Sequence, residues 1–329
     1  MTAAPVLAEV QRGGMVESRH RGHVVVVDDL GTIRWSLGDP LEVIYPRSAV
    51  KPLQAAGMLD AGLDIAGRDL ALAAASHSGE PFHIAGVRGM LGQVGLSEHD
   101  LRCPPDRPYG EAAREAFLIA GEHPARVVMN CSGKHAAMLG TCVVNGWSTR
   151  DYLDPSHPLQ QHLHHTIGVL AGCDPSPWTT DGCGAPLWGL PLVGLARALV
   201  RLPATSSGAR VAAAMRDFPE YCGGTGRDVT ELMRAVPGLV AKDGSESVQA
   251  MMVELDGRRF GIALKVEDGG QRARPVVAAT VLAGLGVESD LLADQQREPV
   301  LGAGRPVGWL GPSATLVDAS ATGSADPPM

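Results

Sequence analysis

Alternating hydrophobic and polar residues predict strands near both ends of the chain. Residues 23–39 contain an apolar run, an Asp-Leu-Gly turn and a second alternating segment, a pattern typical of a β-hairpin. Two more alternating segments, 247–257 and 259–269, meet at an Asp-Gly turn and predict another hairpin. Sheet-forming segments are therefore expected at opposite ends of the sequence.

Apolar residues in the middle of the chain recur three and four positions apart, which is the spacing of an amphipathic helix. This pattern predicts helices over residues 48–59, 83–96, 132–144, 157–172, 186–202, 209–218 and 274–286. Because there is no internal repeat and no clear linker, we expect a single α/β domain over residues 1–311. Residues 312–329 are rich in Ala, Ser, Thr, Asp and Pro and are expected to form a disordered tail.

Composition and charge exclude several classes of partner. The 329 residues are 45% hydrophobic and 19% charged, and the net charge is −8 with no long basic stretch. Nucleic acid and anionic membranes are therefore excluded as expected partners. The N-terminus lacks a cationic flank followed by an apolar stretch, and no apolar run approaches the ~18 residues of a membrane span. We expect a cytoplasmic protein.

Lysine is scarce in this chain, and its positions are therefore informative. Of the 28 basic residues only four are lysines: Lys51, Lys134, Lys242 and Lys265. Arginine stays protonated in proteins, whereas a lysine amine can lose its proton and act as a base. A chain that uses arginine almost everywhere is expected to keep lysine where a neutral amine is needed.

Ser48 and Lys51 are the first candidates for such chemistry. They are three residues apart in a predicted helix, so they share one face and the hydroxyl can meet the amine. Burial or a second nearby cation would lower the pKa of the amine and let it take the hydroxyl proton. The alternative is an N-cap serine followed by a solvated lysine, which needs no chemistry.

Ser76 and Lys265 suggest a second serine–lysine pair. Ser76 and Ser78 lie in a small-residue corner, ASHSGE, and Lys265 lies in a predicted strand, IALKVEDGG. A serine at a helix start, a loop serine and a strand lysine are the elements of serine β-lactamases. The letters SHS and KVE differ from Ser-x-Asn and Lys-Thr-Gly, which argues against a β-lactam substrate and leaves two Ser–Lys couples in one cleft. Lys242, in VAKDG, has no supporting motif and is interpreted as an exposed loop lysine.

The cysteines suggest a metal site rather than a disulfide scaffold, since there are only six in a chain of this length. Cys131 and Lys134 are three residues apart at a predicted helix start, where the helix dipole favours a thiolate. Cys183 lies in a Gly-rich turn after Asp181. Two thiolates could hold Zn²⁺, with Lys134 or His135 completing the ligand set. The alternative is a pair of buried structural cysteines without metal.

Taken together, these stretches resemble the rhizobial-type L-asparaginase family, also called the asparaginase II family. The matching segments run in order from about residue 12 to residue 269 and are RGGMVESRHRGH, LGDP, RSAVKP, ASHSGE, DLRC, NCSGKHAAML, TDGCGAP and KVEDG. The resemblance implies hydrolysis of L-asparagine to L-aspartate and ammonia, and a homodimer. It also implies an α/β fold like that of serine β-lactamases and glutaminases, in which a mixed sheet packs against a helical layer.

The resemblance also assigns roles to residues that match by motif. The catalytic residues are two Ser–Lys couples, Ser48 with Lys51 and Ser76 with Lys265. The zinc ligands beside the cleft are Cys131, Lys134 and Cys183. In this assignment zinc tunes the site or orients the substrate, because the serine already supplies a nucleophile.

Three further residues are hypotheses for substrate binding. Arg47 offers a planar fork for the substrate α-carboxylate, and Asp181 offers a carboxylate for its α-ammonium group. Their alternatives are a surface ion pair and a turn residue, respectively. His135, next to the expected metal ligands, would anchor substrate or support a ligand from behind. Two other functions remain open: an amidohydrolase acting on glutamine or a β-lactam, and a non-catalytic zinc-binding protein of the same fold.

Overall fold

The computed structural model of the chain describes residues 3–322, and these divide into two compact units built from separate segments of sequence. The first unit contains the residues up to Ala49, Leu190–Val200 and the residues from Ala235 onward. The second unit contains Val50–Gly189 and Arg201–Arg234. The single domain expected over residues 1–311 stays a prediction.

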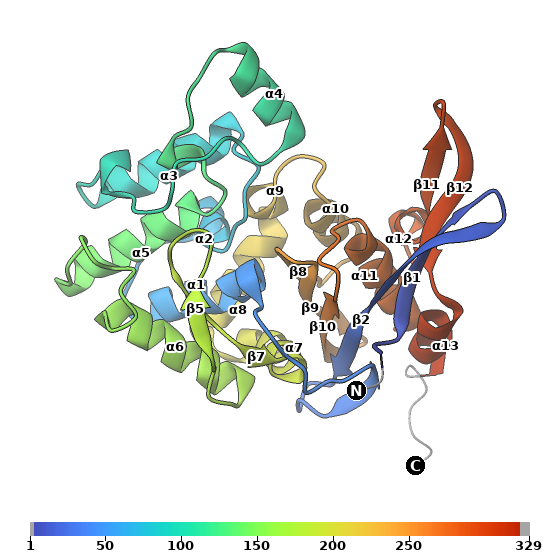
Figure 1. The fold of residues 1–329 in the computed structure, drawn as a ribbon. Helices are drawn as coiled ribbons and strands as arrows, with labels where there is room; N and C mark the ends of the chain where they lie inside the picture. The colour runs from blue at the N-terminus through green and yellow to red at the C-terminus, as the bar shows by residue number, and fades with distance from the viewer. Residues whose placement is uncertain (1–2, 323–329) are drawn as a thin grey trace. The chain divides into compact units, whose positions relative to one another are not determined.

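The first unit is built on an eight-stranded sheet. Its strands are β1 (Val6–Arg12), β2 (Met15–Val27), β3 (Ile33–Leu37), β8 (Val240–Gly244), β9 (Val248–Leu255), β10 (Arg258–Val266), β11 (Glu298–Gly302) and β12 (Arg305–Pro312). The order is β11-β12-β1-β2-β10-β9-β8, with β3 paired to β2, so strands from both ends of the chain are neighbours (Figure 1). The α/β class is confirmed, but every pairing in the described sheet is antiparallel rather than mixed.

The core of this sheet is formed by its central strand, β2. Val24–Val27 are four successive valines with no exposed surface. Because successive residues of a strand point to opposite faces, both faces of β2 are covered here. Helix α7 (Leu192–Arg201) comes so close that a Cβ on Gly261 would lie 2.3 Å from the Ala196 carbonyl oxygen. Both predicted hairpins are confirmed, as β2–β3 and β9–β10.

The end of the chain is ordered further than the sequence predicted. The remaining helices of the first unit are α11 (Ala273–Gly284), α12 (Asp290–Gln295) and α13 (Ala314–Thr322). Helix α13 packs on α11, where a Cβ on Gly284 would lie 2.5 Å from the Ser320 Cβ. Leu316 and Ser320 are buried by this contact, so the expected disordered tail is a packed helix up to Thr322. Residues 323–329 of that expected tail lie outside the described residues.

The second unit is mostly helical. Its helices are α1 (Lys51–Asp60), α2 (Gly67–Ala73), α3 (Pro81–Gln93), α4 (Glu111–Ile119), α5 (Ser132–Asn145), α6 (Pro158–Ala171), α8 (Ser206–Asp217), α9 (Pro219–Cys222) and α10 (Asp228–Ala235). A short hairpin, β5 (Trp178–Thr180) and β6 (Pro186–Trp188), interrupts them. Within residues 3–322, no helix combines the length and apolar character that crossing a membrane requires.

Two central helices of this unit carry lysines into its interior. Helix α1 is buried from Lys51 to Leu59 and packs against α5, α6 and α8. Helix α5 is buried from Ser132 to Cys142, and Gly133 lets its first turn approach the Leu72 carbonyl, 2.4 Å from where a Cβ would sit. Because water is excluded from these helices, a lysine amine on them needs hydrogen-bond partners from the protein itself.

Candidate active site

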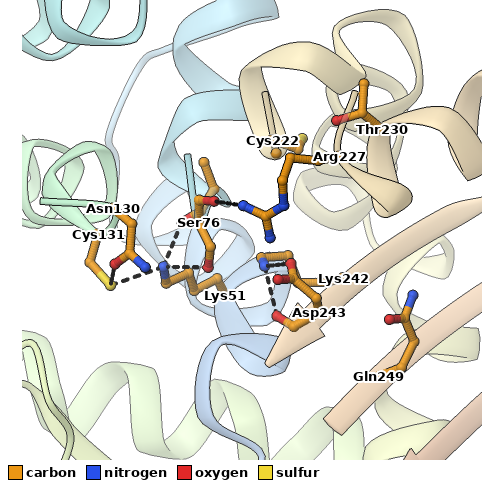
Figure 2. Close-up of polar contacts among 12 residues, drawn as sticks. Lys51, Ser76, Asn130, Cys131, Cys222, Arg227, Thr230, Lys242, Asp243 and Gln249 are labelled. Carbon is orange, nitrogen blue, oxygen red and sulfur yellow. Dashed lines mark hydrogen bonds and ion pairs between the residues drawn. The ribbon is translucent and has the colours of Figure 1, made fainter. Parts of the chain in front are cut away.

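The Lys51 amine is the centre of a buried polar cluster in the second unit. Lys51 is the first residue of α1 and is 1% exposed. Its Nζ lies 2.5 Å from the Ala75 carbonyl oxygen, 3.0 Å from Ser76 Oγ and 3.1 Å from Cys131 Sγ (Figure 2). The carbonyl can only accept, whereas the hydroxyl and the thiol can donate or accept. The amine is therefore placed to exchange a proton with Ser76.

Ser48 lies in a 3-10 turn, Arg47–Val50, that leads directly into α1. The turn begins at Arg47 with φ +52°, a left-handed conformation that is strained for a residue with a side chain. The N-cap of α1 is Val50, and Lys51 is buried. The alternative of an N-cap serine with a solvated lysine is thus wrong on both counts.

The Ser76 loop is held by hydrogen bonds on both sides. The Ser76 backbone N–H donates to the Cys222 carbonyl (3.0 Å), and the His77 N–H donates to the Asn130 carbonyl (3.0 Å). The Gly79 N–H donates to His77 Nδ1 at 3.2 Å, so the ring hydrogen is on Nε2 and points to Ser132 Oγ, 2.8 Å away. His77, which the sequence interpretation did not single out, therefore fixes this loop to the start of α5.

Arg227 covers the other side of the same loop. Its Nη1 donates to the Ser76 carbonyl oxygen at 3.4 Å (Figure 2). Its guanidinium lies 4.6 Å from the centre of the Tyr109 ring. Burial lowers the pKa of His77 well below its usual value, and the neighbouring His83 and Lys51 lower it further. His77 is therefore neutral near pH 7, which agrees with its role as an acceptor from Gly79.

Cys131, Lys134 and Cys183 meet in one buried group. Cys131 is the N-cap of α5, Lys134 follows in its first turn, and Cys183 comes from the loop between β5 and β6. Lys134 Nζ lies 3.2 Å from Cys183 Sγ, and Cys131 Sγ lies 3.1 Å from Asn130 Oδ1. All three side chains are almost fully buried. The structure thus brings together the three residues that the sequence assigned to zinc.

The charges in this group are unequally distributed. The pKa of Cys183 is held well below its usual value by a hydrogen bond from Cys131, and Lys134 and His135 add to this effect against the cost of burial. The same hydrogen bond and burial raise the pKa of Cys131. Burial is the largest influence on Lys134 and would lower its pKa, but the charges at Cys183, Cys131 and Asp181 and the hydrogen bond to Cys183 together raise the pKa. These directions favour a thiolate at Cys183 beside an ammonium group at Lys134, and a protonated thiol at Cys131.

A family profile described as L-asparaginase II matches residues 8–312 of this sequence. The chain belongs to the L-asparaginase II family. Family membership supports an amidohydrolase that acts on a small molecule. No curated protein matches the chain.

The chain is similar to several solved structures at low sequence identity. A putative β-lactamase from Bacteroides dorei is 16% identical over 80% of this chain and 92% of its own, with a TM-score of 0.45. A β-lactamase from Mycobacterium bovis is 15% identical over 80% and 94%, with a TM-score of 0.44. Mglu in its native form is 16% identical over 83% of this chain, with a TM-score of 0.42, and the match spans 65% of Mglu. At these TM-scores we base no argument about function on them.

The donor atoms of this L-asparaginase II family member fit a zinc ion. Cys131 and Cys183 supply sulfur, Lys134 supplies an amine, and the buried Nε2 of His135 beside them lacks a hydrogen-bond partner in the described chain. Among residues 3–322, no group of three or more His, Cys, Asp and Glu side chains is arranged to hold a metal. The expected ligand set contains two cysteines and the Lys134 amine, so it is not a cluster of that kind.

The other expected site residues occupy well-defined positions. Lys265 Nζ, in β10, lies 2.7 Å from the Glu246 carbonyl and 2.5 Å from the Val266 carbonyl, and partial burial lowers the pKa of the amine. Asp181 accepts from the Gly182 N–H at 2.9 Å through its side chain and thereby shapes the turn that carries Cys183. Ser76, which the sequence paired with Lys265, contacts Lys51.

Lys242 corrects the sequence interpretation, which took it for an exposed loop lysine. It lies in β8 with no exposed surface, and its Nζ donates to the Asp243 carbonyl at 2.7 Å and forms an ion pair with the Asp243 carboxylate. The end of β8 packs on the turn that holds Ser48, because a Cβ on Gly244 would lie 2.7 Å from the Pro46 carbonyl oxygen. The sequence feature that could have indicated this burial is a lysine at the end of an apolar strand, followed by Asp-Gly.

Proposed function

We propose that this chain is an L-asparaginase that hydrolyses L-asparagine to L-aspartate and ammonia. The observation that carries the proposal is the buried Lys51 amine, 3.0 Å from the Ser76 hydroxyl, in a member of the L-asparaginase II family. An amine that is closed off from water and touches a hydroxyl can move a proton to and from it. Amide hydrolysis through a serine needs this capacity twice, once for the nucleophile and once for the leaving group.

The proposed reaction uses two Ser–Lys couples. Ser48 Oγ forms a bond to the side-chain carbonyl carbon of asparagine while Lys51, as a neutral amine, takes the hydroxyl proton. The C–N bond then breaks, and the proton passes from Lys51 through Ser76, assisted by Lys265, to the departing nitrogen, which leaves as ammonia. Water attacks the resulting aspartyl ester, releases aspartate and restores the Ser48 hydroxyl. The contact between Lys51 and Ser76 supports the relay step.

Substrate recognition is assigned to residues around these couples. Arg47 binds the α-carboxylate, because its planar guanidinium matches the two oxygens, and Asp181 binds the α-ammonium group. The left-handed backbone of Arg47 supports a role at the site, since strain of this kind is kept where function requires it. His135 lies beside the metal ligands and is proposed to contact what binds there.

Zinc is proposed as a resident cofactor held by Cys131, Lys134 and Cys183. When bound, it would supply a fixed positive charge that orients or polarises the substrate. The chain's own contribution is a water-excluded group in which the pKa of Cys183 is held low, so that this sulfur is ready to bind a cation. A homodimer is also proposed, on the basis of the sequence resemblance alone.

An ammonia-release assay tests the proposal. Wild-type protein, Ser48→Ala, Lys51→Arg and the control Ser36→Ala, an exposed serine in β3, are each given asparagine, glutamine and a β-lactam. We expect release from asparagine by wild type and Ser36→Ala, and a loss of about a thousandfold or more in Ser48→Ala and Lys51→Arg. Full activity in Lys51→Arg would refute the neutral-amine role, because arginine stays protonated.

The same experiment separates the alternatives when opening of the β-lactam, which releases no ammonia, is followed by its change in absorbance. Release from glutamine, or opening of the β-lactam, in place of asparagine turnover would identify an amidohydrolase with another substrate. Background activity with all three substrates, together with one zinc per chain in both wild type and Ser48→Ala, would identify a non-catalytic zinc-binding protein.

A further inference from the structure

Asp268, His20 and Arg272 are joined by hydrogen bonds in the first unit. His20 Nδ1 lies 2.6 Å from Asp268 Oδ2, and Arg272 Nε donates to His20 Nε2 at 3.0 Å. Arg272 Nη2 also donates to Ser18 Oγ at 3.1 Å. His20 belongs to β2 and is 5% exposed, whereas Asp268 and Arg272 follow the end of β10. A buried imidazole thus links two segments that are distant in the sequence.

The guanidinium of Arg272 determines which ring nitrogen of His20 carries the hydrogen. A guanidinium N–H can only donate, so His20 Nε2 accepts through its lone pair. The hydrogen of the neutral ring is then on Nδ1 and is donated to the Asp268 carboxylate. Burial would raise the pKa of Asp268, but its hydrogen bonds and the neighbouring His20 and Lys265 lower it below the ordinary value. The carboxylate is therefore ionised near pH 7 and accepts the ring hydrogen.

The same carboxylate shapes the turn that follows β10. Asp268 Oδ1 accepts from the Gly270 N–H at 2.7 Å, so both of its oxygens are engaged. The Gly269 N–H donates to the Val266 carbonyl at 3.3 Å, and Gly269 has a φ of +71°, which suits a residue without a side chain. Because His20 belongs to β2, the neighbour of β10 in the sheet, its bond to Asp268 fastens this turn to the adjacent strand (Figure 1).

This turn contacts both carbonyl groups that hold the Lys265 amine. The Val266 carbonyl accepts from the Gly269 N–H and from Lys265 Nζ. The other acceptor, the Glu246 carbonyl, belongs to a residue packed on the turn, since a Cβ on Gly269 would lie 2.5 Å from Glu246 Oε2. Glu246 and Ser247 have φ values of +59° and +56°, which are strained for residues with side chains. Strain kept where the backbone supplies an acceptor for the amine supports a function for its position.

We propose that His20 is a positioning residue for Lys265: through Asp268 it fixes the turn after β10 and keeps the lysine amine on its two carbonyl acceptors. The importance of this for catalysis rests on the proposed function, in which Lys265 belongs to the second Ser–Lys couple. An amine held on fixed acceptors is already oriented for proton transfer, whereas a loose lysine side chain has to be ordered in each turnover.

Long-range ¹H–¹⁵N NMR of the histidine rings tests the first part of the proposal in wild-type protein. The His20 signal is assigned by its absence in His20→Asn. We expect a neutral ring near pH 7 with its hydrogen on Nδ1, because Arg272 donates to Nε2. A ring with its hydrogen on Nε2 would overturn the proposal.

Hydrogen exchange of the Lys265 ammonium group with water tests the second part. The chain has only four lysines, and the ¹⁵N signal of Lys265 is assigned by its absence in Lys265→Met. His20→Leu has no donor for Asp268, so we expect exchange about fivefold to tenfold faster. His20→Asn keeps an N–H near the Nδ1 position and should stay close to wild type, as should His123→Leu, an exposed control. An unchanged rate in His20→Leu would overturn the proposal.

A second variant covers the case in which His20→Leu does not fold. The Asp268 side chain is 46% exposed, and Asp268→Ala removes the same hydrogen bond from the other partner. Its Lys265 exchange rate should also rise about fivefold to tenfold. A wild-type rate in this variant would show that the turn does not depend on the bond to His20, and would overturn the proposal.

Steady-state ammonia release connects the position of the amine to turnover. We expect His20→Leu to lower kcat by about tenfold with KM within about twofold of wild type, and His20→Asn to recover most of the rate. Equal losses in both variants would contradict the hydrogen bond to Asp268 as the cause. If Lys265→Met keeps full activity, the second couple of the proposed function fails, while the exchange rates still decide whether His20 holds the amine.

Discussion

The amine of Lys51 lies 3.1 Å from the sulfur of Cys131, so the proposed base and a proposed metal ligand share one buried contact. Cys131 also belongs to the buried group in which Lys134 Nζ lies 3.2 Å from Cys183 Sγ. The proposed base and the proposed metal group are therefore joined through one cysteine. A change at Cys131 is expected to affect both, whereas a change at Cys183 acts on the metal group alone.

The first prediction separates these two effects. With zinc removed by a chelator, Cys131→Ala takes away one of the three partners of Lys51 and should lower kcat by about tenfold, or ~1.4 kcal/mol in the barrier. Cys131→Ser keeps a hydroxyl in that place and should recover part of the rate. Cys183→Ala is the matched control and should stay near wild type under the same conditions. Steady-state ammonia release measures all four proteins; equal losses in Cys131→Ala and Cys183→Ala would contradict a special contact to Lys51.

The second prediction concerns stability at low pH. His77 has a pKa well below 6.5 in the folded protein because it is buried, whereas in the unfolded chain it titrates near 6.5. Between these two pKa values the unfolded state binds more protons than the folded state. The contribution of His77 to the free energy of unfolding is therefore complete above pH 6.5 and decreases as the pH falls below that value. His83, stacked 5.0 Å from His77, has a pKa lowered by burial and acts in the same direction.

Urea unfolding from about pH 8 to about pH 5 measures this dependence. His77→Gln should make the decrease below 6.5 shallower, since one titrating group is lost, and should cost about 1–3 kcal/mol near neutral pH because a buried partner of Ser132 and Gly79 changes. His123→Gln, at an exposed position, is the control and should follow wild type. A His77→Gln curve parallel to wild type would contradict the prediction.

The third prediction is the number of protons that zinc displaces. Metal ligands must be deprotonated, and Cys183 is already a thiolate, while Cys131 keeps its proton and the pKa of Lys134 is raised. Zinc binding near pH 7 should therefore release about two protons, and affinity should fall as the pH decreases. Calorimetry in buffers of different ionisation enthalpy gives this number. In Lys134→Ala it should drop to about one, and an unchanged number would mean that the lysine is not a ligand.

Local patterns in the sequence predicted the elements that depend on local spacing. The β2–β3 and β9–β10 hairpins follow from alternation around Gly-containing turns, and helix α5 follows from the period of residues 132–144. Strands β11 and β12 were not predicted, because their residues are largely exposed and mix Gly and Pro with few apolar positions. Helix α13 was missed because its small residues resemble a tail, and the elements it packs on, α11, β1 and β3, are distant in the sequence.

The site was predictable in its residue types but not in its pairings. Sequence motifs identified Cys131, Lys134 and Cys183 as candidate site residues, and the structure places them in one group. The contact between Lys51 and Ser76 depends on how α1 packs beside the residues after α2, and no spacing along the chain encodes such a packing contact. The burial of Lys242 was missed for a similar reason, since a Lys-Asp-Gly segment at a strand end also fits an exposed turn.

The last prediction compares Lys242 with Lys265 as strand lysines of the first unit. Lys242 is fully buried in an ion pair with Asp243, so Lys242→Met removes the ammonium group of a buried ion pair and should cost about 3–5 kcal/mol in the free energy of unfolding. Lys265 is partly exposed and bonds only to carbonyl groups in the contacts described above, so Lys265→Met should cost about 1 kcal/mol. Urea unfolding of both variants, and of Lys242→Met with Asp243→Asn, gives the comparison, and the double variant should recover part of the loss.

The same Lys265→Met variant tests the assignment of Lys265 to the second Ser–Lys couple. If it abolishes ammonia release at nearly wild-type stability, the assignment is supported; if it keeps full activity, the assignment is wrong.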